Sequence, residues 1–362
     1  GNPLYLLETL KAMVLSPGPH TARGLPTSRN VAQLIGQRLA GLSAQALKLA
    51  RCAAVAGQDF SPALATQVLG VGPLDLADAW LELEAAQVLR DAAFAHDLVH
   101  EVTLASVPAV LARSLHALIA QVLTTQGVPA ARVAAHWLSS DTPQAGAPSL
   151  LAAGRQAAAA LRMQEAQADF LRAADLLQAQ GREQDARDAL VELLQSQYAA
   201  DTEATRAVLD RLELLAHTAP ERAQVAQRRA DVLARSGDFA GAGRVAVAAL
   251  ATLDAEQHPA LAAELLCNAA AGDVLEARHD RALERVHRAV DLAARSGVHT
   301  VERTAACYLG SVLDHSHRYA EGYLAHRRGH DLCLQAAEQA PIELISVLSN
   351  LAGNRAILGH FE

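Results

Sequence analysis

Apolar residues recur at helical spacing along most of this chain, and polar turns interrupt the helical runs at regular intervals. In one such interval, the apolar run that passes through Val225 stops at Gly237, and a second run begins after Asp238. Glycine readily takes the left-handed conformation that ends a helix, and aspartate caps the N-terminus of the next one. The pattern therefore predicts a hairpin of two helices that turns at Gly237, and neither helix can bury its apolar face alone.

The same turn recurs at a spacing of about 40 residues, which lies within the range of helical repeat arrays. Phe239, just after the turn, aligns with Met163, a position near Asp201, Asp280, Tyr319 and Phe361. About three positions later stands a residue that is small in most repeats, namely Ala166, Ala204, Ala242, Leu283 and Gly322. These repeats resemble a tetratricopeptide repeat (TPR) array with long hairpins. The last turn stops at Glu362, inside a repeat, so we expect the chain to be part of a longer protein.

Upstream of the repeats, the pattern predicts a module of shorter helices with one extended hairpin. Helices are expected at residues 31–39, 44–56, 62–69 and 74–86. Ser43 and Ser61 are the expected N-caps of the second and third. The runs 88–90 and 93–95, with a polar break between them, predict a small β-hairpin, and Asp97 is expected to cap the helix that follows. Helices that end in a hairpin are typical of a winged-helix module.

Two stretches rich in proline and glycine, residues 16–27 and 139–149, divide the chain. We therefore expect an opening helix and linker over residues 1–27, a winged-helix and connecting helical module over 28–148, and repeats over 149–362. The predicted fold class is all-α: a winged-helix-like module with one small β-hairpin, followed by a TPR-like α-solenoid.

The composition agrees with this fold and narrows the function. Of the 362 residues, 51% are hydrophobic and only 3% aromatic, which favours helices over strands and excludes general disorder. The net charge of −8 argues against nucleic-acid binding, because phosphate contacts need clustered Lys and Arg. The helix expected at 74–86, where a winged helix would contact DNA, carries Asp75, Asp78, Glu82 and Glu84 and no Lys or Arg.

The residue types that carry catalysis or span membranes form no recognisable pattern. Four cysteines lie within apolar helical runs without C-x-x-C spacing, namely Cys52, Cys267, Cys307 and Cys333. We expect buried, reduced thiols in a cytoplasmic protein. No apolar run reaches the ~18 residues of a membrane-spanning helix, so no membrane partner is expected. No Ser-His-Asp, Cys-His or paired-carboxylate constellation stands out, so no catalytic residue is predicted.

Stacked hairpins place their first helices along a concave surface, where partners bind. Aligned on the turns, these helices carry one row of Arg228, Ala269, Tyr308 and Asn350, and a second row of Val232, Asp273, Val312 and Asn354. An asparagine amide offers a donor and an acceptor to a peptide backbone. The predicted effector groove is therefore Arg228, Tyr308, Asn350 and Asn354.

Two basic clusters make the C-terminal third locally positive within an acidic chain. The first comprises Arg278, His279, Arg281, Arg285, His287 and Arg288. It is either an exposed helix face or a surface for an acidic ligand, and it favours a groove ligand that carries negative charge. The second comprises His315, His317, Arg318, His326, Arg327, Arg328 and His330. Its arginines would repel a cation, so no metal site is predicted.

Several motifs resemble those of STAND-class signalling ATPases and LuxR-type (MalT-like) regulators. Residues 1–8, GNPLYLLE, resemble the signature that closes the ATPase core of that family. Residues 39–43, 53–60, 94–101, 115–116 and 133–137 resemble the module that follows it. A superhelical TPR region comes next in those proteins, so the resemblance covers the whole chain.

The resemblance also implies roles for single residues. In the family, the proline of the opening motif packs near the adenine, and a His-Asp pair after the hairpin faces the β-phosphate, with the histidine as donor. These roles would fall on Pro3, His96 and Asp97, although a polar strand end and a plain N-cap remain the alternative for the pair. No G-x-x-x-x-G-K-[ST] motif and no Walker-B strand occurs. Residues 1–27 would thus hold the end of a missing ATPase core, with ATP or ADP expected only in the intact parent.

The leading hypothesis is a regulatory or sensor fragment that is not itself an enzyme. Its repeats would bind a protein or small effector, and the missing ATPase core would respond in cis. One alternative is a constitutive TPR scaffold without nucleotide control. The other is a winged-helix DNA-binding regulator.

Overall fold

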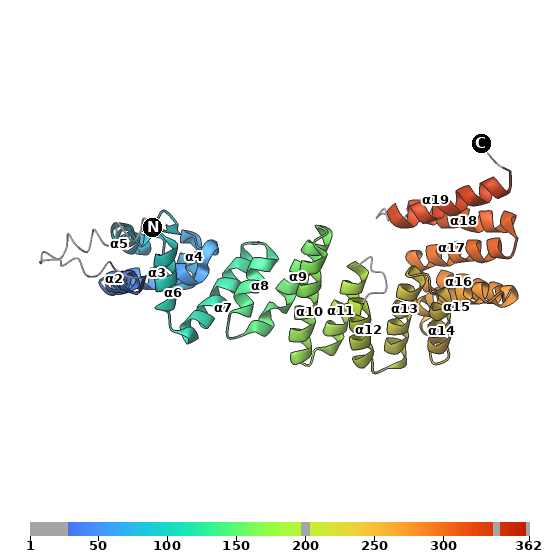
Figure 1. The fold of residues 1–362 in the computed structure, drawn as a ribbon, viewed down its shortest axis with the longest axis horizontal. Coiled ribbons are helices and arrows are strands. Elements are labelled where there is room, and N and C mark those ends of the chain that lie inside the picture. Colours follow the sequence, from blue (N-terminus) through green and yellow to red (C-terminus); the bar gives the residue numbers. More distant parts are fainter. Residues whose placement is uncertain (1–27, 197–202, 336–340, 360–362) are drawn as a thin grey trace, which may run out of the picture. The chain divides into compact units, whose positions relative to one another are not determined.

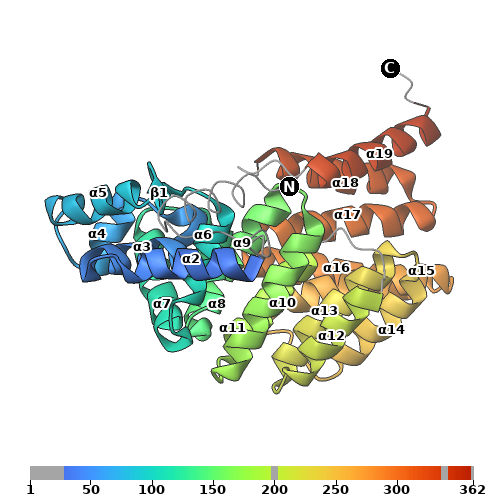
Figure 2. The same ribbon diagram turned by 60° about the vertical axis from the view of Figure 1, so that its left-hand side comes forward.

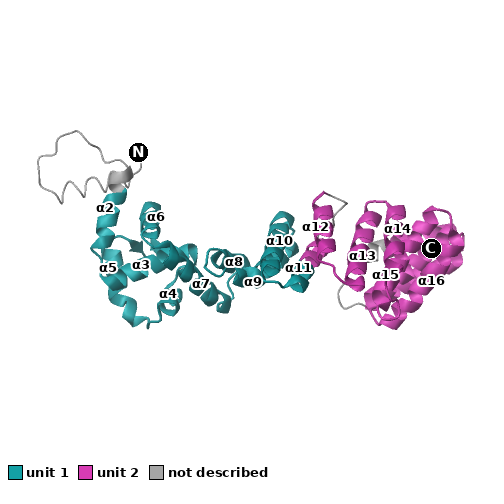
Figure 3. Ribbon diagram, turned by 90° about the horizontal axis from the view of Figure 1, so that it is seen from below, with its two compact units in different colours: residues 1–189 teal, residues 190–362 magenta. Residues whose placement is uncertain are grey.

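The computed structural model describes residues 28–196, 203–335 and 341–359, which are mostly helical (Figure 1). They form eighteen α-helices and one two-stranded hairpin, so the predicted all-α fold is confirmed. The expected helix and linker at 1–27 and the turn near Asp201 lie outside the described residues. The chain packs as two units, residues 1–189 and 190–362 (Figure 3). The boundary predicted between residues 148 and 149 lies within the first unit.

The first unit begins with short helices around one hydrophobic core. These are α2 (Ser28–Ala40), α3 (Ala44–Ala56), α4 (Pro62–Leu69), α5 (Ala77–Ala85) and α6 (Asp97–Ala105), with 3-10 turns η1 (Gly57–Asp59) and η2 (Leu74–Leu76). The strands β1 (Leu89–Arg90) and β2 (Ala93–Phe94) pair antiparallel at the predicted place. Leu49, Leu64 and Leu83 of this core are fully buried, together with Ile119 from the next helix.

The side-chain caps explain where these helices begin. The Ser43 hydroxyl accepts the backbone N–H of Ala46, and the Ser61 hydroxyl accepts that of Leu64, so both predicted caps are confirmed. The predicted cap at Asp97 is wrong by one residue. His96 is the N-cap of α6, because its Nδ1 accepts the backbone N–H of Leu98 at 3.1 Å.

Helical hairpins make up the rest of the chain. The first unit continues with α7 (Ala109–Thr125), α8 (Ala130–Leu138), η3 (Pro143–Gly146), α9 (Ala147–Ala159) and α10 (Met163–Ala179). The division between the units falls within α11 (Glu183–Ser196). The second unit continues with α12 (Glu203–Leu214), α13 (Ala219–Arg235), α14 (Phe239–Leu250), α15 (Pro259–Leu275), α16 (His279–Ser296), α17 (His299–His315), α18 (Tyr319–Gln335) and α19 (Pro341–Ile357).

The helices of the second unit pack as a TPR-like α-solenoid, as predicted. Each helix from α13 to α19 contacts the next along the chain (Figures 1 and 2). The first helices of successive hairpins, α13, α15, α17 and α19, also contact one another in turn. Helix α15 thus lies among four neighbours. Ala262, Leu265, Ala269 and Ala270 are therefore buried although they point in different directions around its axis.

Left-handed residues set the period of these hairpins. Gly237, Ala277, His317 and Gly359 all have positive φ, and they stand 40, 40 and 42 residues apart. The predicted left-handed turn at Gly237 is confirmed, and Asp238 caps α14 through the backbone N–H of Gly241.

The sequence alignment of the repeats is wrong by one residue in the hairpin of α15 and α16. The position equivalent to Phe239 is His279 rather than Asp280, since α16 begins at His279. The small buried residue that follows it is Ala282 rather than Leu283. The alignment at Met163 and Tyr319 is confirmed, because α10 and α18 begin there.

Helices α14 and α15 cross at backbone contact. A Cβ atom added to Gly243 or to Gly272 would lie 2.9 Å from the Cα atom of the other glycine. Backbone atoms cannot move aside as the end of a flexible side chain can. The two glycines therefore permit the short distance between these helices.

No single helix in the described part of the chain is long and apolar enough to cross a membrane. Helices α6 and α7 reach that length and composition only as a pair, and a bend of 112° separates them.

We predict that Gly272→Ala destabilises the chain by about 1–3 kcal/mol, because the added methyl group would press on the backbone of α14. Chemical unfolding followed by circular dichroism measures the change. Gly353→Ala is the control, since a Cβ there would meet nothing within 4 Å, and alanine in a helix should be neutral or stabilising by about 0.5–1 kcal/mol. Equal stability of the two variants would contradict the close crossing.

Candidate functional site

The residues with positive φ identify the equivalent positions of the first helices more accurately than the sequence pattern does. Counting back by the same number of residues from each turn gives Arg228, Asn268, Tyr308 and Asn350 as one row. Asn268 therefore holds the place that the sequence assigned to Ala269, and Gly272 similarly replaces Asp273 in the second row. The error arose because the turn between α15 and α16 uses Ala277, with φ of 56°, where no glycine marks the position.

Side chains of this row form a hydrogen-bond network across three helices. Asp231 of α13 accepts from Gln227 Nε2 at 2.7 Å and from Asn268 Nδ2 of α15 at 3.1 Å. The Tyr308 hydroxyl of α17 donates to Asn268 Oδ1 at 3.4 Å. Asn268 thus links the predicted groove residue Tyr308 to α13. Sequence reasoning missed Asn268 and Asp231, and anchoring on Ala277 would have found Asn268.

A cavity of about 250 Å³ lies over this network. Its walls include Arg228, Asp231 and Arg235 of α13, Glu264 and Asn268 of α15, and Tyr308 of α17. Two predicted groove residues, Arg228 and Tyr308, therefore line the same cavity. Three consecutive first helices contribute to it, which is the arrangement that the solenoid model of a binding groove requires.

The cavity is electrically mixed rather than basic. Arg228 Nη1 lies 3.9 Å from Asp231 Oδ2. Burial raises the pKa of both Asp231 and Glu264 above the ordinary carboxyl range. Burial likewise raises the pKa of Tyr308, so its hydroxyl stays a hydrogen-bond donor at neutral pH. Two guanidinium groups face two carboxyl groups, so the cavity carries donors and acceptors without a strong excess of charge.

The basic cluster expected to reinforce the groove lies elsewhere. Arg278, Arg281 and Arg285 line a second cavity with residues of α14. In α15 this second cavity uses positions 269 and 273, whereas the first uses 264, 267 and 268. At about 100° per residue, these sets lie on different faces of the helix. The expectation that one ligand would meet both the groove and the cluster is therefore wrong.

The two predicted asparagines differ in environment. Asn350 is exposed. Asn354 is only 2% exposed, and its Nδ2 lies 2.9 Å from both carboxylate oxygens of Asp314. The same carboxylate lies 3.0 Å from Nε2 of the fully buried His326. Asn354 therefore joins α19 to α17 as a packing residue, and it is unsuited to contact a ligand directly.

Within the part of the chain that the structure describes, the His96 side chain makes one hydrogen bond, through Nδ1. Because Nδ1 accepts the N–H of Leu98, that nitrogen is unprotonated and the neutral ring carries its hydrogen on Nε2. The ring is half-buried at the start of α6, and Asp97 is exposed in the first turn. Pro3 lies outside the described residues. The nucleotide role of these three residues remains a proposal.

Three of the segments that carry the family resemblance meet in the first unit. His116 Nδ1 lies 2.8 Å from His136 Nδ1, and His136 Nε2 lies 3.2 Å from Asp59 Oδ2. Arg132 pairs with the same carboxylate. Burial and then the nearby His136 lower the pKa of His116 to about 4. This network ties α7 and α8 to the turn after α3, and sequence spacing alone did not bring the three residues together.

The remaining candidates have structural roles. Cys52 and Cys267 are buried as predicted, while Cys307 and Cys333 are half-buried. Burial raises the pKa of the Cys52 thiol to about 12 and that of Cys307 to about 11, so both stay protonated. Within the described residues, the histidines of the second basic cluster contact different partners. His315 lies near the carbonyl of Ser311, and His317 near the hydroxyl of Tyr319.

No protein-family model matches this chain, and no curated protein matches it. Several solved structures are similar to it. A STAND protein with a tetratricopeptide repeat sensor from Pyrococcus horikoshii is 12% identical, with a TM-score of 0.47; the match covers 99% of this chain and 52% of that one. Yeast Tom70 is 14% identical, with a TM-score of 0.39, over 92% of this chain and 59% of that one. A Rap protein complexed with Competence and Sporulation Factor is 12% identical, with a TM-score of 0.38, over 91% and 99%.

We predict that Glu264→Gln raises the melting temperature near pH 7 by a few degrees and has little effect at about pH 4. The folded-state pKa of Glu264 is raised above 4.5 by burial, so the folded chain binds this proton more tightly than the unfolded chain. Stability from this group is thus full at low pH and is lost as pH rises through the raised pKa.

Thermal unfolding at the two pH values measures this effect. Glu284→Gln is the control, because Glu284 is exposed on α16. A pH-independent difference between Glu264→Gln and the parent would contradict the burial of an ionisable group beside the cavity.

Proposed function

We propose that this chain is the effector-binding, regulatory part of a STAND-type signalling ATPase or transcription regulator of the cytoplasm. Its TPR-like repeats bind an extended segment of a partner protein, or a small effector, in the cavity of α13, α15 and α17. The ATPase core in cis responds to that binding, and the chain itself performs no catalysis.

The observation that carries the binding role is the row Arg228–Asn268–Tyr308 along one cavity. An extended peptide presents backbone donors and acceptors in alternation. The carboxyl groups of Asp231 and Glu264 can accept from its N–H groups, and the guanidinium groups of Arg228 and Arg235 can donate to its carbonyls. Because the cavity charges balance, the proposed ligand is a neutral or mixed-charge segment.

The motifs of the N-terminal module support the nucleotide-controlled form of this proposal. In the family that these motifs resemble, the histidine after the hairpin faces the β-phosphate, which supports this role for His96, because Nε2 of its ring carries a hydrogen that it can donate. The positive end of the α6 helix dipole would also attract the phosphate group next to this donor. A constitutive scaffold would use the same cavity without any need for His96.

Selection from a random peptide library on the purified chain tests the groove. We predict peptides that bind with micromolar affinity, and a loss of about tenfold or more for Arg228→Gln, because a charged hydrogen bond is lost. Arg288→Gln, an exposed position on α16, is the matched control and should bind normally. Failure to enrich any peptide, or equal affinity of the two variants, would overturn the groove.

Nucleotide control is tested in the intact parent, which contains the ATPase core. We predict that His96→Ala lowers the ADP that co-purifies with the protein and raises basal signalling, because a phosphate contact of the resting state is lost. His96→Ser can still cap α6 but lacks the ring, so it should lose ADP as well. His299→Ala, at an exposed position, should not. Full ADP occupancy in both His96 variants would overturn the role given to His96.

A further inference from the structure

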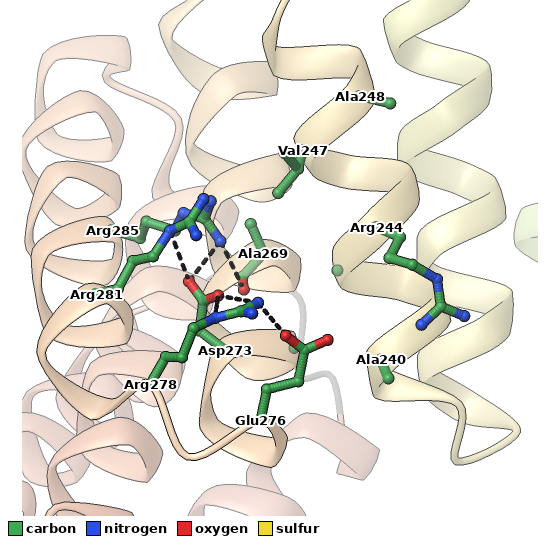
Figure 4. Close-up of a pocket in the computed structure, with 12 residues that line it drawn as sticks. Ala240, Arg244, Val247, Ala248, Ala269, Asp273, Glu276, Arg278, Arg281 and Arg285 are labelled. Carbon is green, nitrogen blue, oxygen red and sulfur yellow. Dashed lines mark hydrogen bonds and ion pairs between the residues drawn. The ribbon is translucent and has the colours of Figure 1, made fainter.

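A second cavity, of about 270 Å³, lies between α14 and α16 over one face of α15 (Figure 4). Four arginines surround it: Arg244 from α14, and Arg278, Arg281 and Arg285 from the start of α16 and the turn before it. Figure 4 shows Arg244 on one wall and the other three on the opposite wall. The glycines of the close helix crossing, Gly243 and Gly272, belong to its lining, and they leave room where side chains would otherwise stand.

Asp273 holds part of this arginine group in place. Its side chain is fully buried, and Arg278 Nε donates to Oδ1 at 2.9 Å. Arg285 pairs with Oδ2 and also donates to the carbonyl of Ala269 at 3.3 Å. These bonds fix the direction of two guanidinium groups, because a buried carboxylate must remain paired.

The group as a whole remains positively charged. Asp273 and Glu276 are the two carboxylates that line the cavity, so four arginines leave an excess of two positive charges. Within the described residues, Arg244 and Arg281 donate no hydrogen bond. Arg281 Nε is 3.8 Å from Asp273 Oδ2, beyond hydrogen-bond distance, and its side chain is 51% exposed. The N–H groups of Arg244 can thus donate to a ligand, and so can those of Arg281, whose contact with Asp273 is a long ion pair rather than a hydrogen bond.

The position of Arg281 adds to the attraction for anions. It stands in the first turn of α16, a helix of 18 residues whose N-terminal end carries partial positive charge. This concentration of positive charge lies inside a chain of net charge −8.

We propose that this cavity binds a small phosphate-bearing ligand, either inorganic phosphate or a phosphate monoester. Free guanidinium groups approach from opposite walls, so the ligand must accept hydrogen bonds on two sides. A tetrahedral phosphate does so with separate oxygens, whereas a single carboxylate presents both of its oxygens on one side. This site is separate from the peptide cavity and independent of the function proposed above.

Calorimetric titration of the purified chain with inorganic phosphate and, separately, with phenyl phosphate as a monoester, at constant ionic strength, tests the site and distinguishes the two sources. We expect saturable binding at one site per chain, and binding weaker by about tenfold to a hundredfold in the double variant Arg244→Gln/Arg281→Gln. Neither side chain donates a hydrogen bond in the described structure, so the variant should fold normally, which thermal unfolding checks.

The double variant Arg327→Gln/Arg328→Gln is the matched control. It removes the same charge from exposed positions on α18, and it should bind phosphate like the parent. If both double variants weakened phosphate binding equally, the loss would follow from the change in net charge alone, and the site would be overturned. Absence of saturation in the parent would overturn it too, and equal binding of succinate would overturn the assignment to phosphate.

Discussion

A single left-handed residue ends the first helix of each hairpin, and the arrangement of the second unit depends on it. Gly237 and Gly359 take this conformation at little cost, whereas Ala277 and His317 take it at a cost of about 1–3 kcal/mol. The packing of the hairpins must offset that cost. Because the turns are 40 residues apart over three hairpins, equivalent positions on α13, α15 and α17 fall in one row, and the peptide cavity is built on that row.

The two cavities show how one helix can serve two different surfaces. On one face, α15 contributes Glu264 and Asn268 to a cavity whose charges balance. On another face, it contributes Asp273 to a cavity with excess positive charge. The turn after α15 and the glycine crossing with α14 determine the second cavity, whereas the hairpin row determines the first. A substitution in one cavity should therefore leave the other largely unaffected.

Most of the fold could be predicted from the sequence, because helix caps and turns depend on residues only a few positions apart. Ser43 and Ser61 cap helices through their own backbone neighbours, and the hairpin after α5 follows from its short extended runs. Errors arose where the deciding partner is distant. Asn354 looked available for a ligand, but Asp314 in another helix occupies its amide. His96 displaced Asp97 as a cap because a ring nitrogen can accept as a carboxylate does, a choice that composition does not reveal.

In the second unit, most contacts join helices that are near in sequence, as is typical of a solenoid. The cavity of α13, α15 and α17 spans two consecutive junctions between hairpins. A rigid ligand that touched both Arg228 and Tyr308 would fix the spacing between α13, α15 and α17. Occupancy would then be transmitted along the solenoid as a change in stiffness, even without movement of any single helix out of its place.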